Sequence, residues 1–420
     1  MKKLELHWKI LIGMAFGVLF GLILSFLDGG DLFIGNYIKP FGTIFINLLK
    51  LIAVPLILAS LIKGVSDLKD ISKLSKMGGR TILTYLITTL TAVTIGLILV
   101  NIVKPGESIS VDTRNELIEA YSTDTKTKQE AAAKQRESGP LKALVDMVPS
   151  NIFLAASNNR NMLQVIFFAL FFGIGMILLP GKKVKAVKDF FDSFNVIILK
   201  LIDLIMLSAP YGVFALLAAL VVEAPSFELF KALALYAITL LFGLSIMILI
   251  YMLVVQLFTK KKISFFMRGM APAQLLAFST SSSAATLPVT MECVEDKLGV
   301  DKEVTSFVLP IGATINMDGT SVYQGVAAVF IAQAFGLDLS LTAQLGIVFT
   351  ATLASIGTAA VPSAGIVMLV IVLAQAGIPE AGLALIFAID RPLDMCRTIV
   401  NVTGDAAVSM IVGKSIGKLK

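Results

Sequence analysis

Ionised and polar side chains interrupt an apolar segment near the C-terminal end of this sequence. The stretch from Ala388 to Asp405 stands between two apolar runs, at 382–388 and 406–412. Its charged and strongly polar members are Asp390, Arg391, Asp394, Arg397, Thr398, Asn401 and Asp405. At about 100° per residue, all of them except Arg391 fall within about a third of the circumference of one helix. The stretch is therefore predicted to be a helix with one ionised face and one apolar face.

Charges in such a segment have a high energetic cost, which limits where they can lie. Each one costs about 2.5–3.5 kcal/mol at the centre of a bilayer on insertion scales, so it normally faces the protein interior or a water-filled cavity. A structural ladder of ion pairs between helices is one explanation. The concentration of six polar groups on one face favours another, a site for a charged small solute and its coupling ions.

Two members of this face have the chemistry that a zwitterion with an extra carboxylate requires. Arg397 presents a planar fork that suits a carboxylate held by two hydrogen bonds. Asp394, one turn earlier, suits an ammonium group. The alternative is that these two side chains pair with each other.

A second polar group lies in the apolar segment 304–335, around Gly312, Asn316 and Asp318. Dehydrated small cations take carboxylate and carbonyl oxygens, and unwound helix carbonyls coordinate sodium in transporters. The group is therefore predicted to be a cation site at a break in the helix. The alternative is a kinked helix in which Asp318 pairs with Arg397 or Arg391.

The composition is that of a membrane protein with many spans. Of the 420 residues, 56% are hydrophobic and 15% are charged, whereas soluble chains are about 25% charged. The net charge of +6 is therefore no argument for nucleic acid as a partner. His7 is the only histidine, so no Ser-His-Asp or Cys-His set is available, and no Walker-type phosphate loop occurs. Cys293 and Cys396 do not suggest a disulfide framework, and the chain is predicted not to be an enzyme.

Eight apolar segments are long enough to span a membrane. They cover 9–27, 41–62, 81–103, 149–180, 191–222, 230–258, 304–335 and 379–412. The first lacks a convincing cleavage site and is predicted to stay as a transmembrane helix. Two further apolar stretches, 263–291 and 340–377, are broken by small and helix-breaking residues. Such breaks are tolerated inside a membrane only within protein or beside a cavity, so both are predicted to be re-entrant hairpins rather than kinked helices.

The tip of the first hairpin is rich in serine, at Ser281, Ser282 and Ser283. Its hydroxyl groups and helix N-termini favour a carboxylate, although such a turn could also pack on itself. Basic clusters alternate with short acidic segments, and the positive-inside rule then places both termini in the cytoplasm. With eight spans, both termini can lie in the cytoplasm only if each hairpin enters and leaves the membrane on the same side. The polar insert from Lys104 to Lys142 falls outside and is predicted to be a loop without chemistry of its own.

Four motifs resemble those of the dicarboxylate/amino-acid:cation symporters, the family of excitatory amino-acid transporters and their prokaryotic glutamate and aspartate homologues. They lie at Ser281–Thr290, Asn316–Thr320, Ser355–Gly365 and Asp394–Asp405, and the likeness covers nearly the whole chain. The resemblance implies an all-α polytopic membrane protein with eight transmembrane helices, two re-entrant helical hairpins, a homotrimeric assembly and an elevator-type motion.

The resemblance also implies two domains. The scaffold would consist of 1–76 (helices 1 and 2) and 143–225 (helices 4 and 5). The transport domain would consist of 77–104 (helix 3) and 226–420 (helix 6, hairpin 1, helix 7, hairpin 2 and helix 8). Residues 105–142 would form an extracellular loop.

The family pattern assigns roles to individual residues. The substrate's amino group would meet Asp394, and its side-chain carboxylate would meet Arg397 and Thr320. Its main-chain carboxylate would meet Asn401 and the tip at Ser281, Ser282 and Ser283, and the pocket would be completed by Thr398, Val361 and Gly365. One sodium site would use Asp405 with backbone oxygens of Gly312, Asn316 and Asn401. A second would use backbone oxygens near Thr314, Met317, Ser355, Ile356 and Thr358, and a third would use Tyr85, Thr88, Thr89, Asn316 and Asp318.

Details of these motifs favour one subgroup. Dicarboxylate carriers of the family lack an aspartate like Asp394, and neutral amino-acid carriers lack an arginine like Arg397. Gln324 stands where proton-coupled animal members have a glutamate, which argues against that proton carrier. We therefore expect a sodium-coupled symporter of L-aspartate and/or L-glutamate in the cell membrane, with the lipid bilayer as its surroundings. Open alternatives are proton coupling, a neutral amino-acid or dicarboxylate carrier, and an anion-conducting channel.

Two departures from the family pattern remain. Ala360 and Ser363 replace glycines in the second tip, so its gate is expected to be stiffer. Arg391, beside Pro392, is either a second cation that faces the substrate or a structural partner of the aspartates.

Overall fold

The described part of the chain is helical, as the apolar segments predict, and contains no strand. The computed structural model describes residues 6–67, 75–110, 112–115, 148–157, 161–223, 227–356, 358 and 364–420. The first half of the chain forms α1 (Leu6–Ser25), α2 (Gly30–Phe33), α3 (Lys39–Asp67), α4 (Ser75–Val103), α8 (Ile152–Ala156), α9 (Met162–Leu178), α10 (Gly181–Leu207) and α11 (Ala209–Glu223). The second half forms α12 (Phe227–Thr259), α13 (Ile263–Thr280), α14 (Ser283–Glu292), α15 (Lys302–Ile315), α16 (Asp318–Ala334), α17 (Leu341–Ile356), α18 (Ala364–Gln375) and α19 (Leu383–Ser415).

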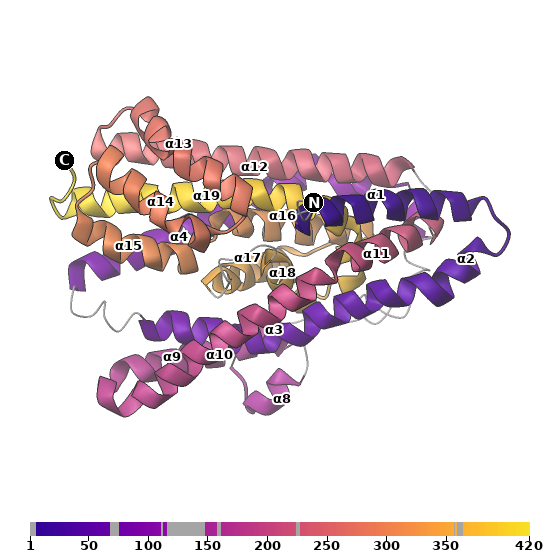
Figure 1. Ribbon diagram of the computed structural model, residues 1–420, viewed down its shortest axis with the longest axis horizontal. Helices are drawn as coiled ribbons and strands as arrows, with labels where there is room; N and C mark the ends of the chain where they lie inside the picture. The colour runs from indigo at the N-terminus through magenta and orange to yellow at the C-terminus, as the bar shows by residue number, and fades with distance from the viewer. Residues whose placement is uncertain are drawn as a thin grey trace, which may run out of the picture.

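The helices form two groups that lie along the long axis of the molecule (Figure 1). In one group α19 packs against α12, α13, α15 and α16, and α4 packs against α12 and α16. In the other, α3 packs against α9, α10 and α11, and α1 packs against α11. The groups meet where α11 touches α19 and where α18 touches α3.

Five helical spans in the described residues are long and apolar enough to cross a membrane, or six if a bent pair counts as one. The five are Trp8–Ser25, Gly30–Ser66, Met77–Ser108, Glu228–Thr259 and Ile389–Ser415. The bent pair is α10 and α11, which meet at Ser208 with an angle of 50°. Pro210 in the first turn of α11 has no N–H to continue the helix, which accounts for the break within the expected span 191–222. The chain is thus a polytopic helical membrane protein, and the count of eight spans stays a prediction.

Both broken apolar stretches form pairs of helices that pack against each other. In the first pair, α13 ends at Ser281 in a left-handed conformation (φ 52°), and Ser282 caps α14 by accepting a hydrogen bond from the N–H of Ala285 at 3.1 Å. In the second pair, α17 and α18 are also in contact. Single kinked helices are therefore ruled out, and re-entry from opposite sides of a membrane stays a prediction. Most of the expected loop 105–142 lies outside the described residues.

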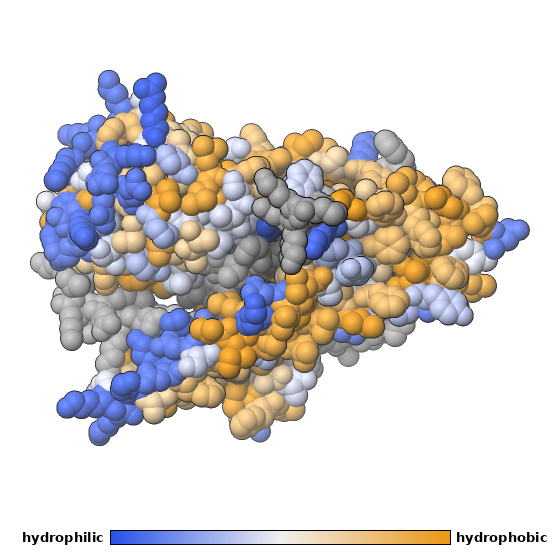
Figure 2. All heavy atoms as spheres, viewed as in Figure 1, coloured by the Kyte–Doolittle hydropathy of each residue, from blue (hydrophilic) through white to orange (hydrophobic). Residues whose placement is uncertain are grey.

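One end of the molecule is hydrophilic, and the middle and the other end are mainly apolar (Figure 2). The connections between α9 and α10 and between α12 and α13, together with the C-terminus, all lie at this hydrophilic end (Figure 1). These are places where the sequence has lysine clusters, at 182–188, 260–262 and 414–420. Basic residues that are distant in sequence thus share one end of the bundle, as a cytoplasmic face requires.

Candidate functional site

The polar face of α19 is buried inside the bundle. Its members Asp390, Asp394, Arg397, Thr398, Asn401 and Asp405 are each between 0% and 6% exposed. The helix continues through Pro392, which is exposed on the opposite side. The expectation that these charges face protein rather than lipid is confirmed.

Arg397 is held from three sides. Its Nη1 donates to Oδ1 of Asp390 at 2.9 Å, and its Nη2 donates to Oδ1 of Asp394 at 2.8 Å. The guanidinium group also lies over the ring of Tyr323 from α16, 3.8 Å from the ring centre. Arg397 and Asp394 thus pair with each other, as the alternative proposed. Asp390 is the other acceptor for Arg397 and therefore belongs to this cluster.

Arg391 is the second cation on this cluster. Its Nη1 donates to Oδ2 of Asp394 at 3.3 Å, and its side chain is 13% exposed. The two oxygens of Asp394 therefore accept from two different guanidinium groups. Of the two roles open for Arg391, the structure contains the pairing with an aspartate.

Helix α16 and the start of α18 close around the same side chains. The N–H of Gly319 donates to Oδ1 of Asn401 at 2.8 Å. A Cβ added at Gly365 would lie 3.0 Å from Cγ2 of Thr320 and 3.9 Å from Nη2 of Arg397. The structure thus brings Thr320, Gly365, Arg397 and Asn401 together, whereas Val361 lies outside the described residues.

The close approach of α16 and α19 depends on Gly319. A Cβ at this position would collide with the backbone carbonyl of Arg397, which cannot move without shifting α19. We expect Gly319→Ala to lower stability by about 1–3 kcal/mol because it overpacks a buried contact, and to weaken solute binding. Thermal unfolding and ligand binding of the purified protein would measure both effects. The matched control is Gly346→Ala within α17, where an added Cβ meets nothing within 4 Å. Equal melting temperatures for the two variants would contradict this account.

The serine tip between α13 and α14 forms hydrogen bonds within itself, and its helices pack on α19. Besides the cap by Ser282, the hydroxyl of Thr286 donates to the carbonyl of Ser282 at 2.8 Å. Gln274 of α13 donates to Oγ1 of Thr403 of α19 at 3.0 Å. The hydroxyl of Ser281 is 97% buried yet has no hydrogen-bond partner in the described chain. The self-packing alternative therefore holds for Ser282, whereas Ser281 keeps an unused polar atom.

A group of oxygen atoms forms at the break between α15 and α16. Asn316 has an extended conformation there, and its Nδ2 donates to Oδ1 of Asp405 at 2.8 Å and to the carbonyl of Asn401 at 3.3 Å. A Cβ at Gly312 would collide with Oδ1 of Asp405 and with the hydroxyl of Tyr85. The predicted break is confirmed, and the four residues assigned to the first sodium site, Gly312, Asn316, Asn401 and Asp405, are neighbours. Asn401 thus belongs to both groups, because its side chain accepts from Gly319 of α16 and its carbonyl accepts from Asn316.

Asp318 lies next to this group and is fully buried. Thr89 of α4 donates to its Oδ1 at 2.7 Å, and the hydroxyl of Tyr251 of α12 donates to its Oδ2. The hydroxyl of Thr88 donates to the carbonyl of Tyr85 at 3.1 Å. The alternative that pairs Asp318 with Arg397 or Arg391 is wrong, because its partners are hydroxyl groups.

Asp318 and Asp405 share an unusual electrostatic situation. Both are at least 98% buried, and the ion pairs found in the described part of the chain include neither of them. Buried carboxylates normally need a paired charge or a metal ion. The neighbouring carbonyl, amide and hydroxyl oxygens are ligands that hard cations prefer. Both positions therefore fit cations.

The second predicted sodium group is less compact. Met317 lies at the break, where its sulfur accepts from Nδ2 of Asn401 at 3.3 Å. Ser355 lies near the end of α17, and the N–H of Thr358 donates to its carbonyl at 3.1 Å. The side chain of Thr314 is exposed, and Ile356 is the last residue of α17. No hydrogen bond joins the two segments in the described chain, so this group stays a prediction.

Sequence reasoning missed the aromatic partners of the site. Tyr251 donates to Asp318, and Tyr323 lies against Arg397. The only signal for Tyr251 was its hydroxyl in the mainly apolar run 230–258, which also contains Tyr236, Thr239 and Ser245. Because buried tyrosine hydroxyls usually find a partner, this signal points to a polar neighbour but not to which one.

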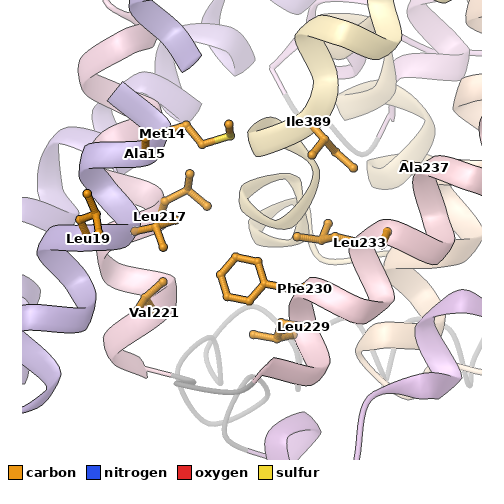
Figure 3. A pocket seen from close by; sticks show the side chains of 12 residues that line it. Met14, Ala15, Leu19, Leu217, Val221, Leu229, Phe230, Leu233, Ala237 and Ile389 are labelled. Atoms are coloured by element: carbon orange, nitrogen blue, oxygen red, sulfur yellow. The ribbon is translucent and has the colours of Figure 1, made fainter. Parts of the chain in front are cut away.

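An apolar cavity lies elsewhere in the described structure. It has a volume of about 590 Å³ and lies between α1 and α11 on one side and α12 on the other, with Ile389 of α19 at its edge (Figure 3). Side chains such as Met14, Leu217 and Phe230 line it, and none of its lining residues is polar. A charged solute would lose its hydration there without gaining a partner, so the cavity does not fit the predicted substrate.

Comparison with known proteins gives a consistent result. Residues 6–415 match the model of the Sodium:dicarboxylate symporter family. Excitatory amino acid transporter 3 of Mus musculus is 38% identical, with 97% of this chain and 85% of that protein aligned. The proton/sodium-glutamate symport protein of Bacillus caldotenax is 35% identical over 100% and 96% of the two chains. The proton/glutamate-aspartate symporter of Escherichia coli (strain K12) is 33% identical over 98% and 93%.

Proposed function

Because the chain belongs to the sodium:dicarboxylate symporter family, we propose that it is a sodium-coupled secondary active symporter of acidic amino acids, L-aspartate and/or L-glutamate. The names of its relatives include glutamate and aspartate as substrates and sodium and protons as coupling ions. The protein would use the inward sodium gradient to accumulate the amino acid across the cell membrane.

One observation carries this proposal. A buried Arg–Asp pair lies on α19, and two buried carboxylates that have no basic partner among the described residues lie on α19 and its neighbour α16. The pair, Arg397 and Asp394, offers a fork for a carboxylate and an acceptor for an ammonium group. The carboxylates, Asp318 and Asp405, offer negative charge to cations. Solute and ions would therefore bind within one packed unit.

The substrate assignments follow the family pattern, and the proximity of Thr320, Gly365, Arg397 and Asn401 supports them. The side-chain carboxylate would take the guanidinium of Arg397 and the hydroxyl of Thr320, and the amino group would take Asp394. The main-chain carboxylate would take the amide of Asn401 and the serine tip, where the unpartnered hydroxyl of Ser281 supports a ligand contact. Thr398, Val361 and Gly365 would complete the walls.

The cation assignments follow the family pattern, and the oxygen groups around Asp405 and Asp318 support two of them. One sodium ion would bind Asp405 with the carbonyls of Gly312, Asn316 and Asn401. Another would bind Asp318 with Tyr85, Thr88, Thr89 and Asn316. A third would bind backbone oxygens of Thr314, Met317, Ser355, Ile356 and Thr358. The sodium ions supply counter-charge to the buried carboxylates, and the residues supply their dehydrated coordination shells.

Proton coupling is the second candidate, because the bacterial relatives are named as proton/sodium or proton symporters. A buried carboxylate such as Asp318 or Asp405 could be neutralised by a proton as well as by sodium. Gln324, fully buried in α16, cannot exchange a proton and removes one possible carrier.

The ion requirement of binding separates these candidates. Labelled aspartate would be titrated against the purified protein at fixed ionic strength, with sodium replaced stepwise by choline at two pH values. We expect the affinity to rise at least tenfold for each tenfold increase in sodium, with little change between the pH values. Equal affinity in choline would refute sodium coupling.

The two helix groups support a division into moving and fixed parts. Residues 77–104 and 226–420 would form a transport domain, and 1–76 and 143–225 a scaffold, with eight spans and two re-entrant hairpins in total. The transport domain would move as an elevator within a homotrimer, with both termini in the cytoplasm. The apolar cavity between α1, α11 and α12 would then lie where the two parts slide.

A bulky side chain in that cavity is expected to block the movement but not the binding. Ala237 on α12 faces the cavity (Figure 3), so Ala237→Trp would wedge α12 against α1 and α11. We expect uptake into proteoliposomes to fall at least tenfold, while aspartate binding to the detergent-solubilised protein stays within about threefold. The matched control is Ile238→Trp, at a neighbouring position that is 62% exposed. Normal uptake by the Ala237 variant would argue against sliding at this surface.

A further inference from the structure

Both carboxylate oxygens of Asp394 already accept a hydrogen bond from a guanidinium group, so its negative charge is shared by two cations before an amino group arrives. Its Oδ1 accepts from Arg397 at 2.8 Å and its Oδ2 accepts from Arg391 at 3.3 Å. An ammonium group carries three donors and no acceptor, so it requires at least one carboxylate oxygen. An ammonium group at Asp394 would be a third cation on one buried carboxylate, and repulsion between the like charges favours the departure of one arginine.

The two arginines differ in how firmly they are held. Arg397 is fully buried, donates to Asp390 as well, and lies against the ring of Tyr323. Arg391 is 13% exposed, and its bond to Asp394 is longer than a typical N–H···O bond. Its long side chain therefore loses less when it leaves, and its partial exposure gives the guanidinium a path toward water. Arg391 is the group that an amino group would displace.

The charges of the cluster show what Arg391 does when no amino acid is bound. Asp390 and Asp394 carry two negative charges, and Arg391 and Arg397 carry two positive charges, so the cluster is neutral. Without Arg391 one buried carboxylate would lack its counter-charge, which is unfavourable in protein and more so inside a membrane. The amino group of a substrate brings one positive charge and can take the place of Arg391 at Asp394, whereas the two carboxylates of the substrate bring negative charge that Arg397 and the sodium ions would balance.

We propose that Arg391 is a tethered cation that occupies the amino-group position of the empty transporter. It leaves Asp394 when the amino acid binds and returns when the amino acid departs, which keeps the cluster neutral while the empty protein moves back. Arg391 is thus a positioning residue for the return step rather than a contact for the substrate. This inference rests on the proposed function.

Two transport assays separate the return step from the loaded step. In exchange, labelled aspartate outside replaces unlabelled aspartate inside with sodium on both sides, and the protein never moves empty. In net uptake, vesicles contain neither aspartate nor sodium, and each cycle includes the empty return. We expect Arg391→Ala to lower the ratio of net uptake to exchange at least tenfold, because only the empty state needs the tethered charge.

The binding experiment gives a second readout. Since Arg391 competes with the amino group for Asp394, Arg391→Ala is expected to bind aspartate several-fold more tightly in detergent. Arg391→Lys keeps the charge and is expected to restore the ratio of net uptake to exchange to within about threefold of the unmodified protein. Arg391→Gln keeps polarity and approximate length without charge, and is expected to behave like Arg391→Ala.

The results that would overturn this inference differ from the result that would refute the proposed function. Equal loss of exchange and net uptake in the alanine and glutamine variants, with weaker binding, would show a structural role and overturn the inference. So would an unchanged ratio, or a lysine variant that behaves like the glutamine variant. If the unmodified protein neither exchanges nor accumulates an acidic amino acid, the proposed function fails instead.

Discussion

Arg397→Cys is expected to lower the affinity for aspartate by about a thousandfold and to make neutral amino acids the better ligands. Breaking a buried charge pair by removing one partner costs about 3–5 kcal/mol, and each 1.4 kcal/mol is a factor of ten in affinity. Arg397 is fully buried and has the donor fork that a side-chain carboxylate would take. A neutral side chain such as that of serine makes no use of this fork. Competition of unlabelled amino acids against each other on the purified variant would give the order of preference.

Removal of Arg397 also affects the two aspartates that pair with it, and the experiment needs a control for this effect. Arg397 also neutralises Asp390 and Asp394, so its removal leaves unpaired charge in the core. Binding of a neutral amino acid by the variant would itself show that the site is folded. Arg268→Cys, an exposed arginine of α13, is the matched control and should leave the preference unchanged. Tight aspartate binding by the Arg397 variant would remove the basis for its assignment.

Asp405→Asn is expected to raise the sodium concentration for half-maximal aspartate binding at least tenfold, which corresponds to about 1.4 kcal/mol. Asparagine has nearly the same shape and can still accept the hydrogen bond from Nδ2 of Asn316. The change therefore removes one full negative charge and little else. A cation stripped of its water depends on that charge, because the other groups assigned to this site, the carbonyls of Gly312, Asn316 and Asn401, are neutral oxygens. A sodium titration of aspartate binding would measure the shift.

A second aspartate gives the control for this experiment. Asp301 caps α15 by accepting from the N–H of Glu303 at 2.9 Å, and it is exposed. Asp301→Asn preserves the cap and should leave the sodium dependence as it is. If Asp405→Asn shows the same sodium dependence as this control, Asp405 is not a sodium ligand.

The sequence predicted where polar groups would be buried better than it predicted their partners. The helical period of Asp390 to Asp405 was enough to place one charged face against protein, because a bilayer tolerates no other orientation. The breaks at Ser281 and at Asn316 were also predictable, since small and polar residues disrupted apolar runs there. Both breaks are present.

Partner choice could not be read from the sequence alone. Arg397 had Asp390 and Asp394 on its own helix and Asp318 on another as possible partners, and only packing against Tyr323 and α18 fixes its position between Asp390 and Asp394. The contact between Thr89 and Asp318 joins residues that are 229 positions apart. The family resemblance suggested this contact, whereas nothing suggested that Tyr251 would be the other donor.

Coupling between solute and ion has a simple physical basis in this arrangement. Arg397 and Asp405 are eight residues apart on α19, which is about 12 Å along a helix. Asn401 lies between them, and its amide group accepts from Gly319 while its carbonyl accepts from Asn316. A cation coordinated by this carbonyl would hold Asn401 in place, and Asn401 is also the residue that faces the solute. Binding at one position then favours the geometry required at the other.

The central claim is that sodium drives the accumulation of an acidic amino acid, and transport under imposed gradients tests it most directly. The purified protein would be reconstituted into vesicles, and labelled aspartate would be followed with an inward sodium gradient, with a proton gradient alone, and with neither. The account predicts accumulation above the external concentration only with the sodium gradient, and loss of the accumulated label when that gradient is dissipated. Accumulation without a sodium gradient, or flux that never exceeds equilibrium, would contradict it.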